Sequence, residues 1–354
     1  MNPKLQVSSS PHTRSSISTQ MIMILVVCAL MPACAMGVLN FGEHALIVLI
    51  LSSASAVGAE YFYEKLLNLP VTVSDGSALV TGLLIGMNMP PQIAWWIPCL
   101  GSVFAIIVVK QLYGGLGKNF MNPALAARCF LLISFAGRMT DFSAGKGRLP
   151  LVTQVASTTD ALSGATPLAY LKTGTSFGLR HLFLGNVAGC IGETSALALL
   201  AGGLFLVAVR VIRIRIPGAC LGTFAVLTLV TAAVRGYASP GIYTLEQLCA
   251  GGLMLGAWFM ATDYVTSPIT PRGQIVFGVL LGILTWIFRM IGTSTEGVSY
   301  AIIFCNLLVP MIERYTRPAA AGVTRQSREA RRLMREQAEE ARRAKAAARK
   351  EKSV

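Results

Sequence analysis

The residues best suited to chemistry in this sequence run from Asp160 to Thr166 and read Asp-Ala-Leu-Ser-Gly-Ala-Thr. They lie in a polar stretch between hydrophobic runs, where a threonine hydroxyl is an exposed oxygen nucleophile. The small residues Gly164 and Ala165 allow a large modifying enzyme to approach the backbone closely. This spacing therefore favours covalent attachment of a bulky group through the Thr166 oxygen. An ordinary loop rich in Ser and Thr is the alternative interpretation.

A second group of candidates consists of charged residues within or beside apolar sequence. Glu193 and Arg128 each fall inside a hydrophobic run. Charges at membrane depth are costly, so they usually face a cavity or pair with one another. Mutual pairing and a role in ion movement remain open alternatives, and Glu193 is the better candidate for ion coupling. Asp75 and Asp263 lie at the ends of hydrophobic runs, where a cytoplasmic vestibule and simple solvation explain them equally well.

The composition indicates the kind of molecule that must position these residues. Of the 354 residues, 54% are hydrophobic and only 13% are charged, which is too apolar for a soluble core with a polar covering. An all-α polytopic membrane protein is predicted, because runs of about 20 apolar residues suffice to cross a bilayer. The expected spans, about ten in number, are 21–39, 45–62, 77–95, 96–112, 121–137, 181–209, 217–234, 247–262, 274–292 and 299–313.

The distribution of Lys and Arg predicts the orientation, since cytoplasmic loops retain basic residues. The cluster from Arg210 to Arg215 is the strongest indication, and it places both chain ends in the cytoplasm. Residues 1–20 and the basic tail 316–354 are then inside, whereas the long loop 138–180 is periplasmic. The start of the chain also fits a cleavable signal, but apolar sequence continues to Leu39, which favours a retained first span.

Two similar halves, 21–137 and 181–315, are predicted from a faint internal echo. Gly82-Leu83-Leu84-Ile85-Gly86 in the first resembles Gly252-Leu253-Met254-Leu255-Gly256 in the second. Two five-span units in one chain must be oppositely oriented, and such inverted repeats place broken helices and ligand sites at their interface. The expected breaks are 88–91 and 262–273, although the Pro-rich stretch 268–273 fits an interfacial turn at least as well.

Several other chemistries have no pattern to support them. The eight cysteines lack metal-site spacing and behave as small buried hydrophobes. The three histidines are scattered, so no metal site is predicted, and neither a nucleotide motif nor a nucleic-acid partner is indicated. No side chains suggest an active site of their own. A bound cofactor would have to carry any redox chemistry.

The motif from Asp160 to Thr166 resembles the flavin-attachment site of the RnfD/NqrB family, the membrane flavin subunits of ion-translocating electron-transport complexes. Other segments strengthen the resemblance, which extends over nearly the whole chain to about Pro318. They are 74–79, 110–115, 122–124, 192–195 and 261–263.

The resemblance implies a fold of inverted repeats similar to urea channels. It further implies FMN joined through its phosphate to Thr166, with Asp160, Ser163, Gly164 and Ala165 as the recognised motif, and in relatives a second, noncovalent flavin such as riboflavin. The chain would then pass electrons in a bacterial inner-membrane complex that links NADH and ferredoxin chemistry to Na⁺ or H⁺ translocation.

The implied partners are other membrane subunits, a periplasm-facing FMN subunit, cytoplasmic iron–sulfur and flavin subunits, a flavin transferase and the lipid membrane. No stand-alone catalysis is expected of this translocase subunit. A small-solute channel or transporter of the same fold, without redox function, is the alternative.

Overall fold

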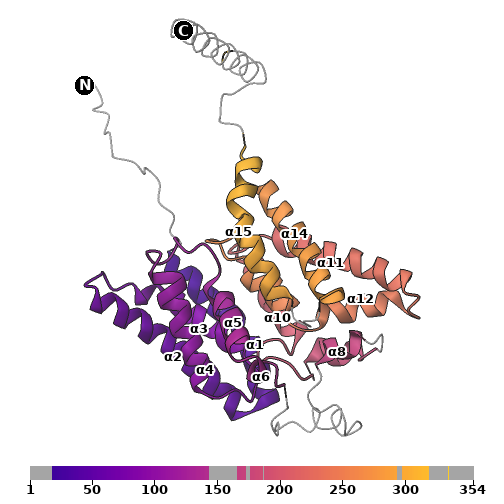
Figure 1. Ribbon diagram of the computed structural model, residues 1–354, viewed down its shortest axis with the longest axis horizontal. Helices are drawn as coiled ribbons and strands as arrows, with labels where there is room; N and C mark the ends of the chain where they lie inside the picture. The colour runs from indigo at the N-terminus through magenta and orange to yellow at the C-terminus, as the bar shows by residue number, and fades with distance from the viewer. Residues whose placement is uncertain are drawn as a thin grey trace, which may run out of the picture. The chain divides into compact units, whose positions relative to one another are not determined.

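The computed structural model describes residues 18–142, 166–172, 176–185, 187–292, 297–318 and 334. Within these residues the chain forms helices and no β-strand, which confirms the all-α prediction (Figure 1). The chain divides into two units, Met1–Glu313 and Arg314–Val354. The arrangement described below is that of the first unit.

Among the described residues, five helices are long and apolar enough to cross a membrane by length and composition, as expected of a multi-pass membrane protein. They are α1 (Thr19–Phe41), α2 (Glu43–Leu66), α11 (Arg215–Val234), α14 (Pro271–Met290) and α15 (Val298–Thr316). The shorter apolar helices are α3 (Ser77–Met87), α4 (Trp96–Phe104) with its π-helical continuation η2 (Ala105–Gln111), α5 (Pro123–Ser134) and α10 (Ala196–Ala208).

The remaining elements are short. They are η1 (Val73–Asp75), α6 (Ala136–Met139), α8 (Pro167–Lys172), α9 (Leu179–Leu184), α12 (Pro240–Cys249), α13 (Leu253–Leu255) and the π-helix η3 (Gly256–Met260).

Three of the expected spans are interrupted rather than continuous, which corrects their predicted bounds. The span 77–95 stops being helical after α3 ends at Met87, and the span 181–209 is non-helical between α9 and α10. The span 247–262 breaks after α12 and resumes at α13. Asn88, Pro90 and Pro91 explain the first break, as predicted, because proline supplies no amide hydrogen for a continuing helix.

Two of these breaks satisfy one another's backbone. The Ile191 amide donates to the Met89 carbonyl at 3.0 Å, and the Gly192 amide donates to the Met87 carbonyl at 2.8 Å. Irregular backbone at membrane depth is tolerated only where protein or water pairs its polar groups. The pairing therefore explains how the first two breaks persist in apolar surroundings.

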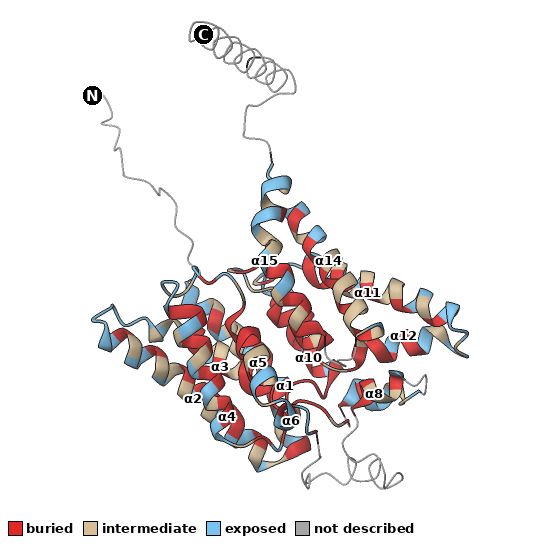
Figure 2. Cartoon of the chain, viewed as in Figure 1, coloured by how far each residue is buried: buried red, intermediate tan, exposed pale blue. Residues whose placement is uncertain are grey.

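Glycines allow the long helices to approach closely. A side-chain carbon at Gly82 of α3 would lie 2.7 Å from the Ser52 carbonyl oxygen of α2, and one at Gly282 of α14 would lie 2.7 Å from the Cys220 carbonyl oxygen of α11. Figure 2 shows buried residues concentrated along α5, with exposed residues more frequent on α2. The inverted repeat, its boundaries and the similarity to urea channels remain predictions.

Candidate functional site

Thr166 immediately precedes helix α8 and is 7% exposed. Its carbonyl oxygen accepts from the Ala169 amide at 2.8 Å, which begins the first turn of that helix. Leu168 and Leu171 are buried against Tyr243 and other residues of α11 and α12. The rest of the predicted motif lies outside the described residues; it comprises Asp160, Ser163, Gly164 and Ala165.

The surroundings of Thr166 fit a phosphoester-linked group in chemical type. The residue supplies the hydroxyl oxygen that such a bond needs, directly before a short helix whose apolar residues pack in the core. At the other end of α8, the Lys172 ammonium donates to the Gly292 carbonyl oxygen at 2.9 Å. The expectation that Thr166 is exposed is wrong for the described residues, because most of its surface is covered.

Arg128 and Glu193 form a buried ion pair between α5 and the second break. Arg128 Nη1 lies 2.9 Å from Glu193 Oε1, and the same guanidinium also donates to Asn88 Oδ1 and, through Nη2 at 3.6 Å, to Cys190 Sγ. The pairing alternative from the sequence is confirmed. Glu193 does not lie within a helix, however, because the chain is non-helical from Val187 to Ser195.

The Arg128 guanidinium connects the first two breaks. Asn88 donates from Nδ2 to the Leu84 carbonyl oxygen at 2.6 Å, which satisfies a carbonyl at the end of α3. Arg128 Nη1 donates both to the Asn88 amide oxygen and to the Glu193 carboxylate. The second carboxylate oxygen of Glu193 has no hydrogen-bond partner in the part of the chain that the structure describes.

A second buried arginine, Arg289 of α14, is not among the residues predicted from the sequence. It donates from Nη1 to the Gln247 carbonyl oxygen at 2.6 Å and from Nη2 to the Ala250 carbonyl oxygen at 2.9 Å. These carbonyls end α12, where positive charge is favourable. The available signal was a single basic residue deep in the expected span 274–292.

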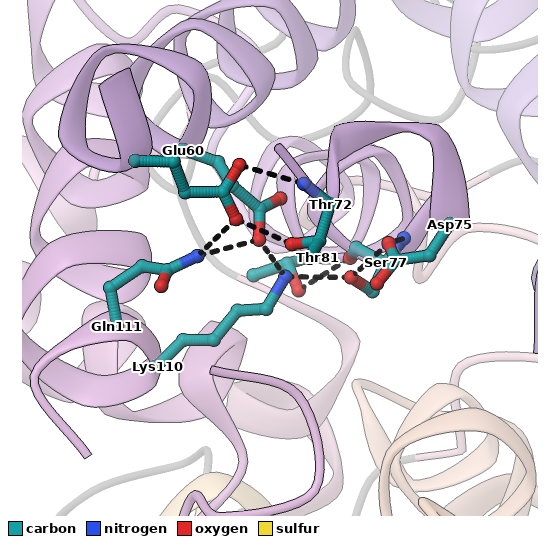
Figure 3. Close-up of polar contacts among 8 residues, drawn as sticks. Glu60, Thr72, Asp75, Ser77, Thr81, Lys110 and Gln111 are labelled. Carbon is teal, nitrogen blue, oxygen red and sulfur yellow. Dashed lines mark hydrogen bonds and ion pairs between the residues drawn. The ribbon is translucent and has the colours of Figure 1, made fainter. Parts of the chain in front are cut away.

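A separate polar network joins α2, η1, α3 and η2 (Figure 3). The buried Lys110 ammonium donates to Glu60 Oε1 at 2.5 Å and to Ser77 Oγ at 2.6 Å. Gln111 also donates to Glu60 Oε1, at 2.8 Å. Asp75 accepts from the Ser77 amide at 2.8 Å, so this predicted candidate lies at the edge of the network.

This network is not predicted from the sequence, because Lys110 lies at the end of an expected span, where it is interpreted as a basic residue of a cytoplasmic loop. The detectable signal was the pair Glu60 and Glu64, two acids one helical turn apart in an apolar run. Both acids are buried, and Glu64 accepts from the Thr72 amide at 2.9 Å.

A cavity of about 100 Å³ lies beside the network. Its polar lining includes Lys110, Asn119, Asn122 and Asp263. Burial raises the pKa of Asp263, and hydrogen bonds from the Val265 amide and the Thr266 hydroxyl oppose this shift.

Tyr264 follows Asp263 and also lines the cavity. Burial first, and then the negative charges of Asp263 and Asp75, raise the pKa of Tyr264 to about 12. The two carboxylates therefore lie near one tyrosine. The structure does not bring them to Arg128 and Glu193, whose hydrogen-bonding partners lie at the helix breaks.

Known proteins are similar in sequence to this chain over nearly its whole length. A family model described as the NQR2, RnfD, RnfE family matches residues 6–322. The chain belongs to this family. It is 46% identical over 332 residues to the D subunit of the Na(+)-translocating ferredoxin:NAD(+) oxidoreductase complex of Acetobacterium woodii, covering 92% of this chain and 98% of the relative.

Two further relatives are similar along nearly their whole length. The D subunit of the proton-translocating ferredoxin:NAD(+) oxidoreductase complex of Clostridium ljungdahlii is 42% identical over 333 residues, covering 90% of this chain and 96% of that protein. The D subunit of the ion-translocating oxidoreductase complex of Escherichia fergusonii is 38% identical over 349 residues, covering 90% and 98%.

Membership of the NQR2, RnfD, RnfE family confirms the resemblance inferred from the sequence. The matched residues include Thr166, the ion pair of Arg128 and Glu193, and the network around Lys110. Within the described residues, no group of three or more His, Cys, Asp or Glu residues could hold a metal ion.

Proposed function

We propose that this chain is the D subunit of an ion-translocating ferredoxin:NAD⁺ oxidoreductase complex and that it carries FMN on Thr166. The observation that carries the proposal is the near-complete alignment with subunits of that name, at 38–46% identity. The sequence from Asp160 to Thr166 supports the flavin part of the proposal, because it supplies a threonine hydroxyl beside small residues.

Attachment would follow ordinary phosphoryl chemistry. A flavin transferase would use FAD, the Thr166 oxygen would bond to the phosphorus on the FMN side, and AMP would leave as the hydroxyl proton is lost. Asp160, Ser163, Gly164 and Ala165 would form the segment that the transferase recognises. The bound flavin would supply single-electron transfer, and α8 would hold its attachment point against the core.

The ion pair of Arg128 and Glu193 is our proposed centre of ion coupling. Glu193 is 4% exposed and has a carboxylate oxygen with no hydrogen-bond partner in the described ranges. Buried acids of this kind mark cation and proton pathways in membrane proteins. Arg128 would set the charge of the pair. Asp263, which lines the cavity, and Asp75, at the edge of the Lys110 network, would be further candidates for the ion path.

The chain would work within a bacterial inner membrane, with both ends in the cytoplasm and residues 138–180 in the periplasm. Its partners would be the other membrane subunits, a periplasm-facing FMN subunit and cytoplasmic iron–sulfur and flavin subunits. A second, noncovalent flavin such as riboflavin is part of the proposal by resemblance, without assigned residues.

Ferredoxin-driven NAD⁺ reduction by membrane vesicles tests the proposed role of Thr166. Thr166→Ala is expected to abolish ion uptake coupled to this reaction, whereas Thr166→Ser keeps a hydroxyl and should retain part of it. Assembly of each variant is checked by co-purification of the complex. Full coupled activity in assembled Thr166→Ala complexes would refute the proposed electron route.

A further inference from the structure

The turn between α12 and α13 contains two consecutive glycines, Gly251 and Gly252, that face different groups. Gly251 has a φ of +62°, a conformation that residues with side chains rarely adopt. A side-chain carbon at Gly251 would lie 2.5 Å from Leu168 Cδ1. Leu168 belongs to α8, two residues after Thr166, so this glycine contacts the helix that follows the proposed attachment site.

The neighbouring Gly252 faces the buried ion pair instead. A side-chain carbon at Gly252 would lie 2.5 Å from Glu193 Oε1 and 3.6 Å from Arg128 Nη1. Two consecutive residues of one turn thus touch α8 on one side and the ion pair on the other. At either glycine, an added methyl group would force the neighbouring side chain to move.

The turn is fixed by Arg289. Its two terminal nitrogens hold the Gln247 and Ala250 carbonyl oxygens, directly before the glycines. The same helix, α14, ends beside Gly292, whose carbonyl oxygen accepts from Lys172 of α8. The turn and the end of α8 at Lys172 are therefore both held from α14. Because Leu168 of α8 packs directly against Gly251, a displacement of α8 changes a contact with the turn.

We infer that the turn formed by Gly251 and Gly252 is a mechanical link between the helix that follows Thr166 and the ion pair of Arg128 and Glu193. Its residues are positioning residues, since they act through these neighbours. Movement on either side of the turn displaces the other side, because close-packed groups transmit small shifts. The importance of the link for ion transport rests on the proposed function, but the link itself does not require bound FMN.

Hydrogen–deuterium exchange of the assembled, membrane-embedded complex tests the link from the side of the ion pair. Gly252→Ala crowds Glu193 without touching α8. We expect the amide exchange rate of α8 (Pro167–Lys172) to rise about fivefold or more, the lower end of typical coupling between sites. Gly241→Ala is the matched control, because Gly241 lies on the same helix α12 with no atom near its missing side chain.

A reciprocal measurement uses a cysteine that the chain already contains. Cys190 is 1% exposed, and its sulfur accepts from Arg128. Leu168→Ala removes the contact of α8 with the turn. The rate of Cys190 alkylation by N-ethylmaleimide, followed by peptide mass spectrometry, should then rise about fivefold or more.

Each outcome decides the inference. If Gly252→Ala does not assemble, Glu193→Asp keeps the charge but withdraws the carboxylate from Gly252, and the same increase in α8 exchange is expected. Wild-type exchange of α8 in assembled Gly252→Ala or Glu193→Asp complexes, or wild-type Cys190 alkylation in Leu168→Ala, would overturn the link. The same measurements on Thr166→Ala complexes separate the two proposals, because the link should persist there even if the flavin assignment fails.

Discussion

Among single residues, Arg128 and Glu193 illustrate how a buried charge is made tolerable. The guanidinium is satisfied by a carboxylate, an amide oxygen and a sulfur from two separate chain breaks. The carboxylate is less completely satisfied, since Oε2 has no hydrogen-bond partner within the described part of the chain. This imbalance favours Glu193 over Arg128 as the group that exchanges an ion or proton.

Glu193→Gln should impair ion translocation more than flavin attachment. The amide keeps the size of the side chain and can still accept from Arg128, but it cannot carry the negative charge. We expect ion uptake per electron in proteoliposomes to fall about tenfold, a coupling of ~1.4 kcal/mol. Glu246→Gln is the control, because Glu246 is also buried and also has one carboxylate oxygen without a partner in the described residues, but its other oxygen accepts from the Ser176 hydroxyl and the Gly178 amide rather than from an arginine. Undiminished ion uptake in Glu193→Gln would show that the charge of Glu193 is not needed for ion translocation and that the residue has a packing role.

The ion pair could be predicted from the sequence, whereas the Lys110 network could not. Glu193 and Arg128 stand out because each lies deep in an apolar run. Lys110 lies near the end of a run, where solvation is the ordinary interpretation of a lysine. Its burial depends on Glu60, which is 50 residues away along the chain, and long-range proximity of this kind has no local sequence signal.

Among the helices, the half-helices α3 and α12 end in similar ways. Each ends at a break. At the end of α3, Asn88 donates to a backbone carbonyl oxygen and in turn accepts from Arg128. At the end of α12, Arg289 donates directly to a backbone carbonyl oxygen. The macrodipole of a helix makes its carboxyl end negative, so both arrangements are electrostatically favourable.

Gly82→Val should destabilise the contact between α3 and α2. The Ser52 carbonyl oxygen and Ser53 Cα lie 2.7 Å from the position of an added carbon, so the helices must separate. Overpacking of this kind costs about 1–3 kcal/mol. Thermal unfolding in detergent would show a lower midpoint for Gly82→Val. Gly58→Val on α2, which has no neighbouring atom at that position, should leave the midpoint nearly unchanged, and equal midpoints for the two variants would contradict the packing.

The existence of most helices follows from hydrophobic run length, but their interruptions follow only partly. Pro90 and Pro91 predict the first break from the sequence. The second and third breaks contain glycines and small residues that also occur within membrane helices. In the second break, backbone amides donate to the Met87 and Met89 carbonyl oxygens, and at the third break Arg289 donates to a backbone carbonyl oxygen. These hydrogen bonds join residues far apart along the chain, so the local sequence does not predict the breaks.

For the molecule as a whole, the proposed electron route depends on which side of the membrane each loop faces. The charge distribution predicts a periplasmic loop at 138–180 and cytoplasmic ends. This prediction is independent of the family match, which concerns sequence similarity alone.

Impermeant maleimide labelling of intact cells tests the predicted orientation. Cysteine introduced at Ser157 should be labelled from outside, whereas cysteine introduced at Ser353 should react only after the membrane is opened. The parent chain provides the background from its eight native cysteines. The reverse pattern would place Thr166 on the cytoplasmic side and remove the periplasmic electron route.

The proposed flavin linkage is tested by the intact mass of this chain, purified from a host that contains the flavin transferase, followed by mapping of the peptide that holds Thr166. The expected mass is that of the sequence plus one FMN less one water, with the added mass on Thr166 and absent in Thr166→Ala. An unmodified Thr166 in the assembled wild-type complex would contradict the proposal.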